Sequence, residues 1–358
     1  MSAVPHPDSA PAVALVTGAT GVVGRNLLAH LATLPHWSAI AVSRRPPEPA
    51  PRQRHLAVDL LDPADCAAKL GAFEAATHVF HCAYAERPTA TAMIEPNLAM
   101  LHNVVRAVEP AAQGLRHVHL TQGTKYYGSH LGPFRTPARE SDARPAGPNF
   151  YHDLQDWLET RQRGRAWTWS AARPHAVIGF ALGNPMNLST VIAVYATLCK
   201  AAGEPFGFPG TPAAFRALYQ CTEAGLLARA MTWMATTPAC ANQAFNITNG
   251  DLIRWENLWP QLAAFFDVTP GPVRGIRLAT AMAGKGPLWD ETVHRHGLLP
   301  HRYDEIVSWP YGDAVFSSGW DIVSDTGKAR RAGFADCVDT EAMFLDLFAS
   351  YRARRIIP

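Results

Sequence analysis

The feature that most constrains this chain is a glycine-rich segment near its N-terminus, Thr17-Gly18-Ala19-Thr20-Gly21-Val22-Val23-Gly24. It follows a short apolar run at 13–16 and precedes a stretch with helical apolar spacing at 25–34. Glycine adopts backbone angles that a Cβ forbids and lets the backbone approach an anion closely. The following helix offers free N–H groups and a positive dipole end. We therefore predict a dinucleotide pyrophosphate site at Gly18, Thr20, Gly21, Val22, Val23 and Gly24; the alternative is a tight turn without a ligand.

The rest of the chain alternates between short apolar runs and helical patterns. Strands are predicted at 39–43, 55–60, 77–82, 117–121, 168–173 and 244–247, and a helix at 98–108. This alternation predicts an α/β fold with a Rossmann-type, doubly wound parallel sheet. Beyond residue 183 helical patterns dominate, at 188–202, 222–234 and 257–266. We expect a disordered lead-in at 1–11, a Rossmann domain at 12–183, and a mainly helical, substrate-capping region at 184–358 with some strands returning to the sheet.

Composition excludes several classes of function. Of the 358 residues 48% are hydrophobic and 17% charged, which supports a sizeable core. With 32 basic and 30 acidic residues, the chain has no charge excess that favours nucleic acid or an acidic membrane. No apolar stretch is long enough to span a bilayer, and the N-terminus lacks a signal-peptide pattern. Six cysteines without a C-x-x-C pair and fifteen histidines without H-E-x-x-H indicate a cytoplasmic protein that binds no metal.

The end of the second predicted strand carries the residues that select the dinucleotide. An NAD site usually has an acidic residue here, whereas an arginine accommodates the 2′-phosphate of NADP. The chain has Ser43-Arg44-Arg45 and no Asp or Glu between 39 and 47. These residues predict NADPH, unless both arginines are only solvated surface charges. Asp59 and Leu60, at the end of the third predicted strand, are placed to border the adenine, although Asp59 could equally cap the next turn.

A tyrosine and a lysine are candidates for chemistry on a bound substrate. Many short-chain dehydrogenases use a Tyr with a Lys four residues later on the same helix. Here Tyr151 opens a predicted helix, but residue 155 is Gln. Among only five lysines, Lys125 lies just past the predicted strand at 117–121, at the sheet edge where active sites of this fold lie. We therefore pair Lys125 with Tyr151 as the catalytic candidates; core packing and a surface position are the respective alternatives.

These residues resemble the motifs of the progesterone 5β-reductase/iridoid synthase family, an atypical branch of the extended short-chain dehydrogenases. Gly123, Lys125 and Tyr127 match its T-G-x-K-H-Y-like motif, which carries the catalytic Lys. Asn149-Phe150-Tyr151 and Asp156 match N-F-Y-Y-x-x-E-D, which carries the catalytic Tyr. The similarity runs from about Ala14 to Pro358 and includes the following segments: 132–134, 173–174, 179–180, 186–188, 194–196, 199–200 and 244–251.

The departures from the family pattern surround the same residues. Tyr126 stands where the family usually has His, His152 replaces the second Tyr, and Gln155 replaces Glu. Tyr84 lies near the place of a Trp in relatives, and 127–131 carries extra residues. We expect a substrate pocket lined by Tyr84, Tyr126, Tyr127 and Phe150, and further cofactor contacts from Thr121, Tyr151, Ile178 and Met186.

The resemblance implies NADPH-dependent reduction of a carbon–carbon double bond conjugated to a carbonyl. Hydride would reach the β-carbon while the Tyr151 phenol, with Lys125 beside it, stabilises the enolate oxygen. Two alternatives stay open: NADPH-dependent reduction of the carbonyl itself, and an NADP-binding regulatory module without catalysis. The expected partner is a small apolar carbonyl-conjugated substrate, and the oligomeric state stays open between a monomer and a homodimer.

Overall fold

The alternating strands form one parallel sheet in the computed structural model, which describes residues 11–184 and 186–358. Most of the expected lead-in at 1–11 lies outside the described residues. The seven strands run in the order β10-β6-β5-β4-β1-β2-β3, and every neighbouring pair is parallel. This order contains the 3-2-1-4-5-6 arrangement of a Rossmann sheet, so the predicted fold class is confirmed. The strands are β1 (Ala12–Thr17), β2 (Trp37–Val42), β3 (Gln53–Leu56), β4 (His78–His81), β5 (His117–Thr121), β6 (Thr168–Pro174) and β10 (Gln243–Ile247).

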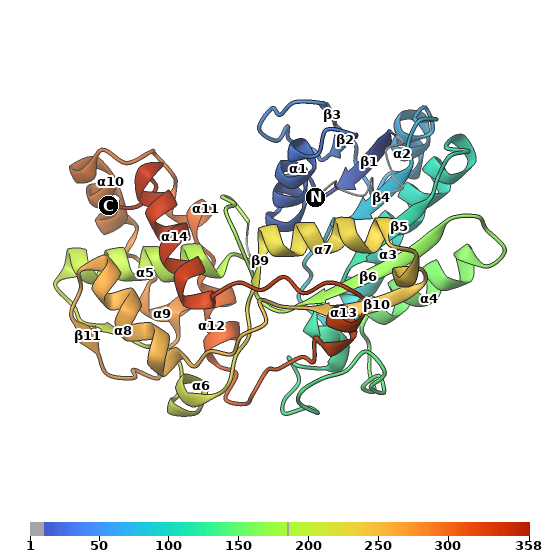
Figure 1. Ribbon diagram of the computed structural model, residues 1–358. Coiled ribbons are helices and arrows are strands. Elements are labelled where there is room, and N and C mark those ends of the chain that lie inside the picture. The colour runs from blue at the N-terminus through green and yellow to red at the C-terminus, as the bar shows by residue number, and fades with distance from the viewer. Residues whose placement is uncertain (1–10, 185) are drawn as a thin grey trace, which may run out of the picture.

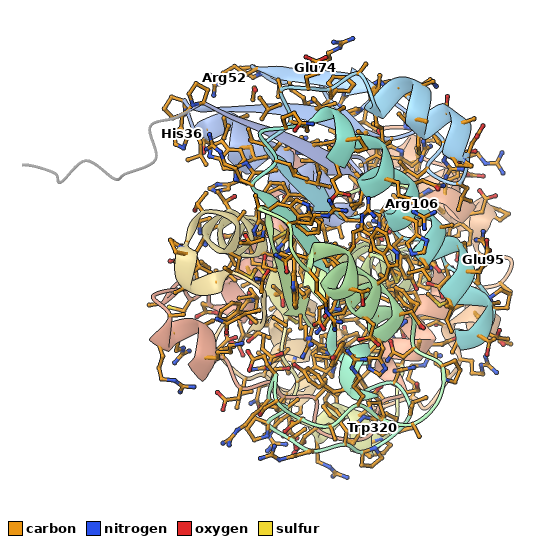
Figure 2. All side chains as sticks on the ribbon, turned by 90° about the vertical axis from the view of Figure 1, so that its right-hand side faces the viewer. His36, Arg52, Glu74, Glu95, Arg106 and Trp320 are labelled. Carbon is orange, nitrogen blue, oxygen red and sulfur yellow. The ribbon has the colours of Figure 1, made fainter. Side chains whose placement is uncertain are left out.

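Helices cover both faces of the sheet because alternate strand residues are apolar on each face. Leu15 of β1 packs with residues of α2, α3 and α4, while Ala14 and Val16 pack with residues of α1 and α7. Glu95 and Arg106 lie on the exposed side of α3 (Figure 2). These layers are formed by α1 (Val22–Thr33), α2 (Pro63–Leu70), α3 (Ala90–Ala111), α4 (Phe150–Gln162) and α7 (Ala224–Thr236).

A second, mainly helical part lies beside the carboxyl ends of the strands (Figure 1). Its centre is α5 (Leu188–Ala202), which is buried from Leu188 to Cys199. Around it pack α8 (Trp255–Phe266), α12 (Trp309–Phe316) and α14 (Thr340–Ala353). In the described residues no helix has the length and apolar character to cross a bilayer. The remaining elements are α6 (Pro212–Arg216), α9 (Leu278–Ala281), α10 (Gly286–His296), α11 (Tyr303–Ile306), α13 (Gly327–Arg331), the short strands β7 (Val177–Ile178), β8 (Phe206–Gly207), β9 (Thr222–Glu223) and β11 (Pro270–Gly271), and the 3₁₀ helices η1 (Thr124–Tyr127) and η2 (Pro238–Cys240).

Several predicted element ends are wrong, and local capping explains them. The helix predicted at 98–108 begins at Ala90, because Thr89 accepts a hydrogen bond from the Ala92 N–H. The helix predicted from 222 begins at Ala224, because the Glu223 carboxylate caps it and residues 222–223 pair with β7. The strand predicted at 55–60 ends at Leu56, which leaves Asp59 in the following turn.

The helical part and the sheet share long stretches of chain. Strand β10 comes from beyond residue 183 yet pairs with β6, and α7 packs on α1 and β6. Trp320 also contacts the segment after β5, because its indole N–H donates to the Ser129 carbonyl at 3.1 Å. In Figure 2, Trp320 lies at the opposite end of the view from Arg52. The chain thus crosses between the two parts repeatedly, and the domain limits at 183 and 184 stay a prediction.

Candidate functional site

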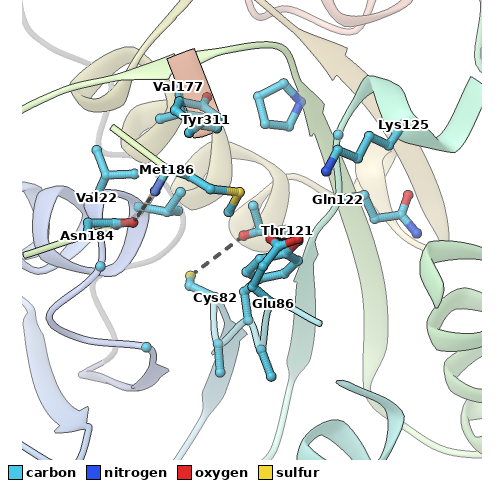
Figure 3. A pocket seen from close by; sticks show the side chains of 18 of the residues that line it. Val22, Cys82, Glu86, Thr121, Gln122, Lys125, Val177, Asn184, Met186 and Tyr311 are labelled. Carbon is cyan, nitrogen blue, oxygen red and sulfur yellow. Dashed lines mark hydrogen bonds between the residues drawn. The ribbon is translucent and has the colours of Figure 1, made fainter. Parts of the chain in front are cut away.

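A cavity of about 830 Å³ lies at the carboxyl ends of the strands and reaches the helical part. Segments that follow β1, β2, β4, β5 and β6 line it on one side. Residues 311–322, from α12 onward, line it on the other. Figure 3 shows Lys125, Thr121, Glu86, Met186 and Tyr311 among its lining side chains. This is where the Rossmann fold binds its ligands.

The glycine-rich turn forms one end of the cavity through Gly18, Thr20, Gly21, Val22 and Val23. Gly18 has φ +67°, and a Cβ on it would lie 2.7 Å from the Cys82 carbonyl oxygen. Gly21 is the N-cap of α1, with no side-chain cap and no acidic residue in the first turn. The helix N-terminus is thus open to an anion.

Gly24 does not line the cavity. It lies within α1, and a Cβ there would overlap the Gly18 carbonyl group. The absence of a side chain at Gly24 therefore allows the close packing of helix on turn. The predicted cofactor contact of Gly24 stays a prediction.

Ser43, Arg44 and Arg45 line the cavity at the end of β2. The Ser43 hydroxyl donates to the Arg45 carbonyl at 2.6 Å and so fixes the local turn. Both arginines are exposed, and within the described residues neither forms an ion pair. Two guanidinium groups without an ion-pair partner in the described residues therefore lie at the edge of the cavity.

The remaining predicted cofactor contacts divide between the cavity and the core. Asp59, Leu60, Thr121 and Met186 line the cavity. Asp59 also accepts a hydrogen bond from the Leu61 N–H at 3.0 Å, so it caps the turn as the alternative predicted. Ile178 does not line the cavity, because it lies in β7 and is only 1% exposed within the core around α5.

Lys125 and Tyr151 both line the cavity although 26 positions separate them in the chain. Lys125 lies in η1, just beyond β5, and Tyr151 lies in the first turn of α4. Asn149 connects them, because its amide donates to the Lys125 carbonyl at 2.7 Å and its Oδ1 accepts from the Tyr151 N–H at 3.1 Å. A Cβ on Gly123 would lie 3.5 Å from the Tyr151 hydroxyl, so this hydroxyl lies against the Gly123–Lys125 motif.

Burial keeps the Tyr151 hydroxyl protonated. It raises the pKa of Tyr151 above its ordinary range, and the Glu86 carboxylate and Tyr311 add to this effect. The hydroxyl has no hydrogen-bond partner among the residues that the structure describes. A neutral phenol without a protein partner is a donor available to a ligand oxygen.

Tyr84 and Phe150 form the aromatic wall beside Tyr151. The rings of Tyr84 and Phe150 lie 5.7 Å apart, and those of Phe150 and Tyr151 4.1 Å apart. The Tyr84 hydroxyl donates to Glu86, a carboxylate on the cavity wall. This packing of the three rings fixes the position of the Tyr151 ring. The Glu86 carboxylate is a negative charge beside these aromatic residues.

Tyr126 and Tyr127, which we predicted to line the substrate pocket, are not among the residues that line this cavity. In a 3₁₀ helix successive side chains point about 120° apart, so Lys125 can face the cavity while its neighbours do not. The Tyr126 ring lies 3.4 Å from the guanidinium carbon of Arg173. The Tyr127 hydroxyl accepts from Arg173 at 2.9 Å and donates to the Asn246 Oδ1 at 2.6 Å.

Arg173 is the centre of a buried network behind the catalytic candidates. It is 1% exposed and donates to Gln122 at 3.0 Å, to Gln155 at 3.0 Å and to the Tyr127 hydroxyl. Gln122 in turn donates to the Tyr151 carbonyl at 3.1 Å. The network therefore joins η1, α4 and β6 beneath the site.

We expect Arg173→Met to lower the free energy of unfolding by about 3 kcal/mol, because three buried acceptors each lose one donor. Urea unfolding followed by tryptophan fluorescence measures the loss. Arg295→Met is the matched control, since Arg295 is exposed and, among residues 11–184 and 186–358, forms an ion pair with Glu291 alone. Equal losses in the two variants would contradict the assigned network.

Sequence reasoning missed many residues of the cavity wall, among them Glu86, His175, Tyr219 and Tyr311. Glu86 and His175 follow strand ends, which is the signal that could have found them. Tyr219 and Tyr311 follow no strand of the main sheet and carry no local motif. Across the described residues, no three His, Cys, Asp or Glu side chains gather as a metal site.

Comparison with known families agrees with this site. The family model described as the PRISE-like Rossmann-fold domain matches residues 57–358. The chain belongs to the PRISE-like Rossmann-fold family. The predicted resemblance is confirmed, because PRISE abbreviates the progesterone 5β-reductase and iridoid synthase-like group. The glycine-rich turn precedes the matched segment but falls within the full-length similarities to individual relatives.

Three curated relatives are similar along nearly the whole chain. An (S)-8-oxocitronellyl enol synthase of Camptotheca acuminata is 32% identical over 98% of this chain and 95% of its own length. A 3-oxo-Delta(4,5)-steroid 5-beta-reductase of Arabidopsis thaliana is 32% identical over 98% and 94%. The short chain dehydrogenase gsfE of Penicillium aethiopicum is 31% identical over 97% and 100%.

Solved structures support the fold. The UDP-glucose 4-epimerase of Thermotoga maritima has a TM-score of 0.69 at 15% identity, covering 95% of this chain and 99% of its own. The Bordetella bronchiseptica enzyme WbmG, in complex with NAD, has a TM-score of 0.68 at 16% identity, covering 98% and 97%. Together with the sheet order, these similarities show a Rossmann fold.

Proposed function

We propose that this protein is an NADPH-dependent reductase of carbon–carbon double bonds conjugated to a carbonyl. The observation that carries the proposal is the meeting of Lys125 and Tyr151 in the cavity that begins at the glycine-rich turn. The named activity of the Arabidopsis relative, a steroid 5-beta-reductase with 3-oxo-Delta(4,5) substrates, supports the same reaction class.

The cavity residues fit NADPH. Gly18 leaves no room for a Cβ, the N-terminus of α1 is uncapped by any side chain, and Arg44 and Arg45 have no acidic partner in the described chain. The turn would hold the pyrophosphate, and the arginines the 2′-phosphate. When bound, NADPH supplies the hydride.

The chain's own residues act on the substrate oxygen. Tyr151 donates a hydrogen bond to the carbonyl oxygen, and this bond strengthens as negative charge develops there. Lys125 contributes a positive charge to the same end of the cavity and favours the enolate. Tyr84 and Phe150 hold the phenol ring in place and exclude water from it.

Product analysis after turnover with 2-cyclohexen-1-one tests the proposal. A saturated ketone supports reduction of the double bond, whereas an unsaturated alcohol would establish the alternative, reduction of the carbonyl. NADPH binding with no turnover on a broad panel of enones and carbonyls would favour the third reading, a regulatory module. The retained Lys125 and Tyr151 argue against that third reading.

We expect Arg44→Ala with Arg45→Ala to reduce the preference for NADPH over NADH. Each charge-assisted hydrogen bond to a phosphate contributes about 1.5–3 kcal/mol, so the ratio of the two cofactors' kcat/KM values should fall at least tenfold. Steady-state kinetics with both cofactors measures the ratio. Arg54→Ala is the control, because Arg54 is an exposed arginine of β3 outside the cavity. A wild-type enzyme that uses both cofactors equally would refute the role given to Arg44 and Arg45.

A further inference from the structure

A proline-rich segment, residues 44–52, leads from Arg44 and Arg45 past α1 to β3 (Figure 1). Four of its nine residues are proline, and none of the nine belongs to a helix or a strand. Its exposure has a period of three, because Pro47 and Ala50 are half-buried and the other residues are exposed. This period is typical of an extended polyproline II helix, which is stiff although it has no internal hydrogen bonds. The segment is therefore a stiff connection between the two arginines and β3.

Arg52 attaches the far end of the segment to α1. Its guanidinium donates to the carbonyls of Ala32 at 2.8 Å and Leu34 at 3.2 Å, which lie at the C-terminal end of the helix. It also donates to the Trp37 carbonyl at 3.0 Å. Arg52 has φ +55°, a conformation that glycine adopts without strain and other residues rarely do. The three bonds of the side chain explain why an arginine is held at this position.

Glu48 attaches the middle of the segment to the other end of the same helix. Its carboxylate pairs with Arg25 at 2.5 Å, and its carbonyl oxygen accepts from the Gln53 side chain at 3.0 Å. Arg25 lies in the first turn of α1, where its N–H donates to the Gly21 carbonyl at 2.9 Å. The Glu48 side chain is 69% exposed, and an ion pair of such exposure contributes little to the stability of a fold. The effect of this pair is thus to set where the segment lies relative to the N-terminus of α1.

We propose that Arg25, Glu48 and Arg52 are positioning residues for cofactor selection. Together they hold Arg44 and Arg45 in place relative to the pyrophosphate site at the N-terminus of α1. This inference rests on the proposed function and deepens its account of NADPH binding. A cofactor held by its pyrophosphate would present its 2′-phosphate to guanidinium groups whose backbone is already fixed, so less conformational freedom is lost on binding. A cofactor without that phosphate gains nothing from the two attachments.

The ratio of the dissociation constants of NAD⁺ and NADP⁺, measured by calorimetry, tests this inference without turnover. Both cofactors carry the pyrophosphate, so an effect on that site cancels in the ratio. We expect Glu48→Gln, Arg25→Met and Arg52→Gly each to lower the ratio by about two- to fivefold, the range of exposed ion pairs. Glu48→Gln combined with Arg25→Met should lower it no further than one of them alone, because both remove the same contact.

Arg355→Gly is the matched control for Arg52→Gly. Arg355 is another exposed arginine in the left-handed region, with φ +56°, and it lies outside the cavity. Both variants relieve the same backbone strain, but only Arg52→Gly removes an attachment of the segment. The ratio should therefore stay at the wild-type value in Arg355→Gly.

The sign of the shifts separates positioning from a direct effect of charge. Through charge alone, loss of the Arg25 cation would weaken binding of the 2′-phosphate, whereas loss of the Glu48 carboxylate would strengthen it. Opposite shifts of the ratio in Arg25→Met and Glu48→Gln would therefore overturn the inference. Additive effects in the double variant would overturn it as well.

Hydrogen exchange of residues 43–53 without cofactor gives a second readout. Backbone amides of this stretch should exchange faster in Glu48→Gln and in Arg52→Gly, because each variant frees part of the segment from α1. Exchange at the wild-type rate in both variants would overturn the inference. Thermal melting identifies a variant that fails to fold, and the variant of the other attachment then completes the test.

The outcomes also distinguish this inference from the proposed function. A wild-type preference for NADP⁺ that none of the three variants lowers overturns the positioning role alone. A wild-type ratio of one overturns the role of Arg44 and Arg45 and the positioning role with it. A preference that falls as expected, in an enzyme that reduces no enone, overturns the proposed reaction alone.

Discussion

Tyr151→Phe is expected to lower kcat for enone reduction by about 10²–10³-fold, which is the usual effect of removing one donor to a developing oxyanion. Phenylalanine keeps the ring that packs at 4.1 Å on Phe150, so the aromatic wall stays intact. The hydroxyl that it removes has no bond to another described residue, so the fold loses no hydrogen bond. The expected change therefore falls on the chemistry. Stopped-flow absorbance of NADPH at saturating substrate measures it.

Controls separate this role from a general disturbance of the cavity. Tyr303→Phe removes a phenol hydroxyl outside the cavity and should leave kcat unchanged. Lys125→Met removes the neighbouring charge and should lower kcat in the same direction as Tyr151→Phe. Combining the two should cost less than the product of the single effects, because both groups act on one oxygen. A Tyr151→Phe enzyme with wild-type turnover would exclude Tyr151 as the donor and leave another cavity phenol in that role.

Acidification is expected to unfold the protein well above pH 4, because the sheet contains buried neutral histidines. Burial lowers the pKa of His78 and of His81 to about 4 and that of His119 to about 3. The pKa of His117 is also lowered, chiefly by burial. In the unfolded chain these side chains bind protons from about pH 6.5 downward, whereas the folded chain does not. Stability is thus fully present above pH 6.5 and is lost as the pH falls.

The expected slope is steep. Each such histidine costs about 1.4 kcal/mol of stability per pH unit below its unfolded pKa, so the four together cost about 6 kcal/mol per pH unit. A total stability of about 5–15 kcal/mol is then consumed within a few pH units. Urea unfolding at pH 8, 7, 6 and 5 measures the slope.

His119→Phe should reduce this slope by about one quarter, because it keeps a ring beside Phe80 and removes one of the four titrating groups. His296→Phe, at an exposed position of α10, should leave the slope unchanged. A His119→Phe variant with the full wild-type slope would show that His119 does not contribute to acid unfolding.

Local sequence patterns were sufficient to place the glycine-rich turn and the two arginines at one end of the cavity. Gly18, Gly21, Arg44 and Arg45 all lie in the cavity, because turn geometry and strand ends depend on residues close in sequence. The Lys125–Tyr151 pair could be predicted from the sequence for the same reason, since Lys125 follows a strand and Asn149 is a recognisable helix cap.

The substrate end depends on contacts that no local pattern encodes. Tyr126 and Tyr127 are neighbours of Lys125, yet the tight 3₁₀ turn directs them toward Arg173. The burial of Arg173 could not be predicted from the sequence. Tyr219 and Tyr311 reach the cavity only because the helical part folds back over the strand ends. Their positions in the cavity result from tertiary packing, because both residues lie more than 60 positions from Tyr151 in the sequence.

The late pairing of β10 with β6 has a consequence for synthesis of the chain on the ribosome. Strand β6 ends at Pro174, and its partner begins only at Gln243, 69 residues later. At translation rates of roughly 5–20 residues per second, the β6 edge stays unpaired for roughly 3–14 s. An unpaired apolar strand edge is a template for pairing with another chain. The nascent protein therefore passes through an interval of aggregation risk, in which a chaperone that covers this edge would raise the yield of folded enzyme.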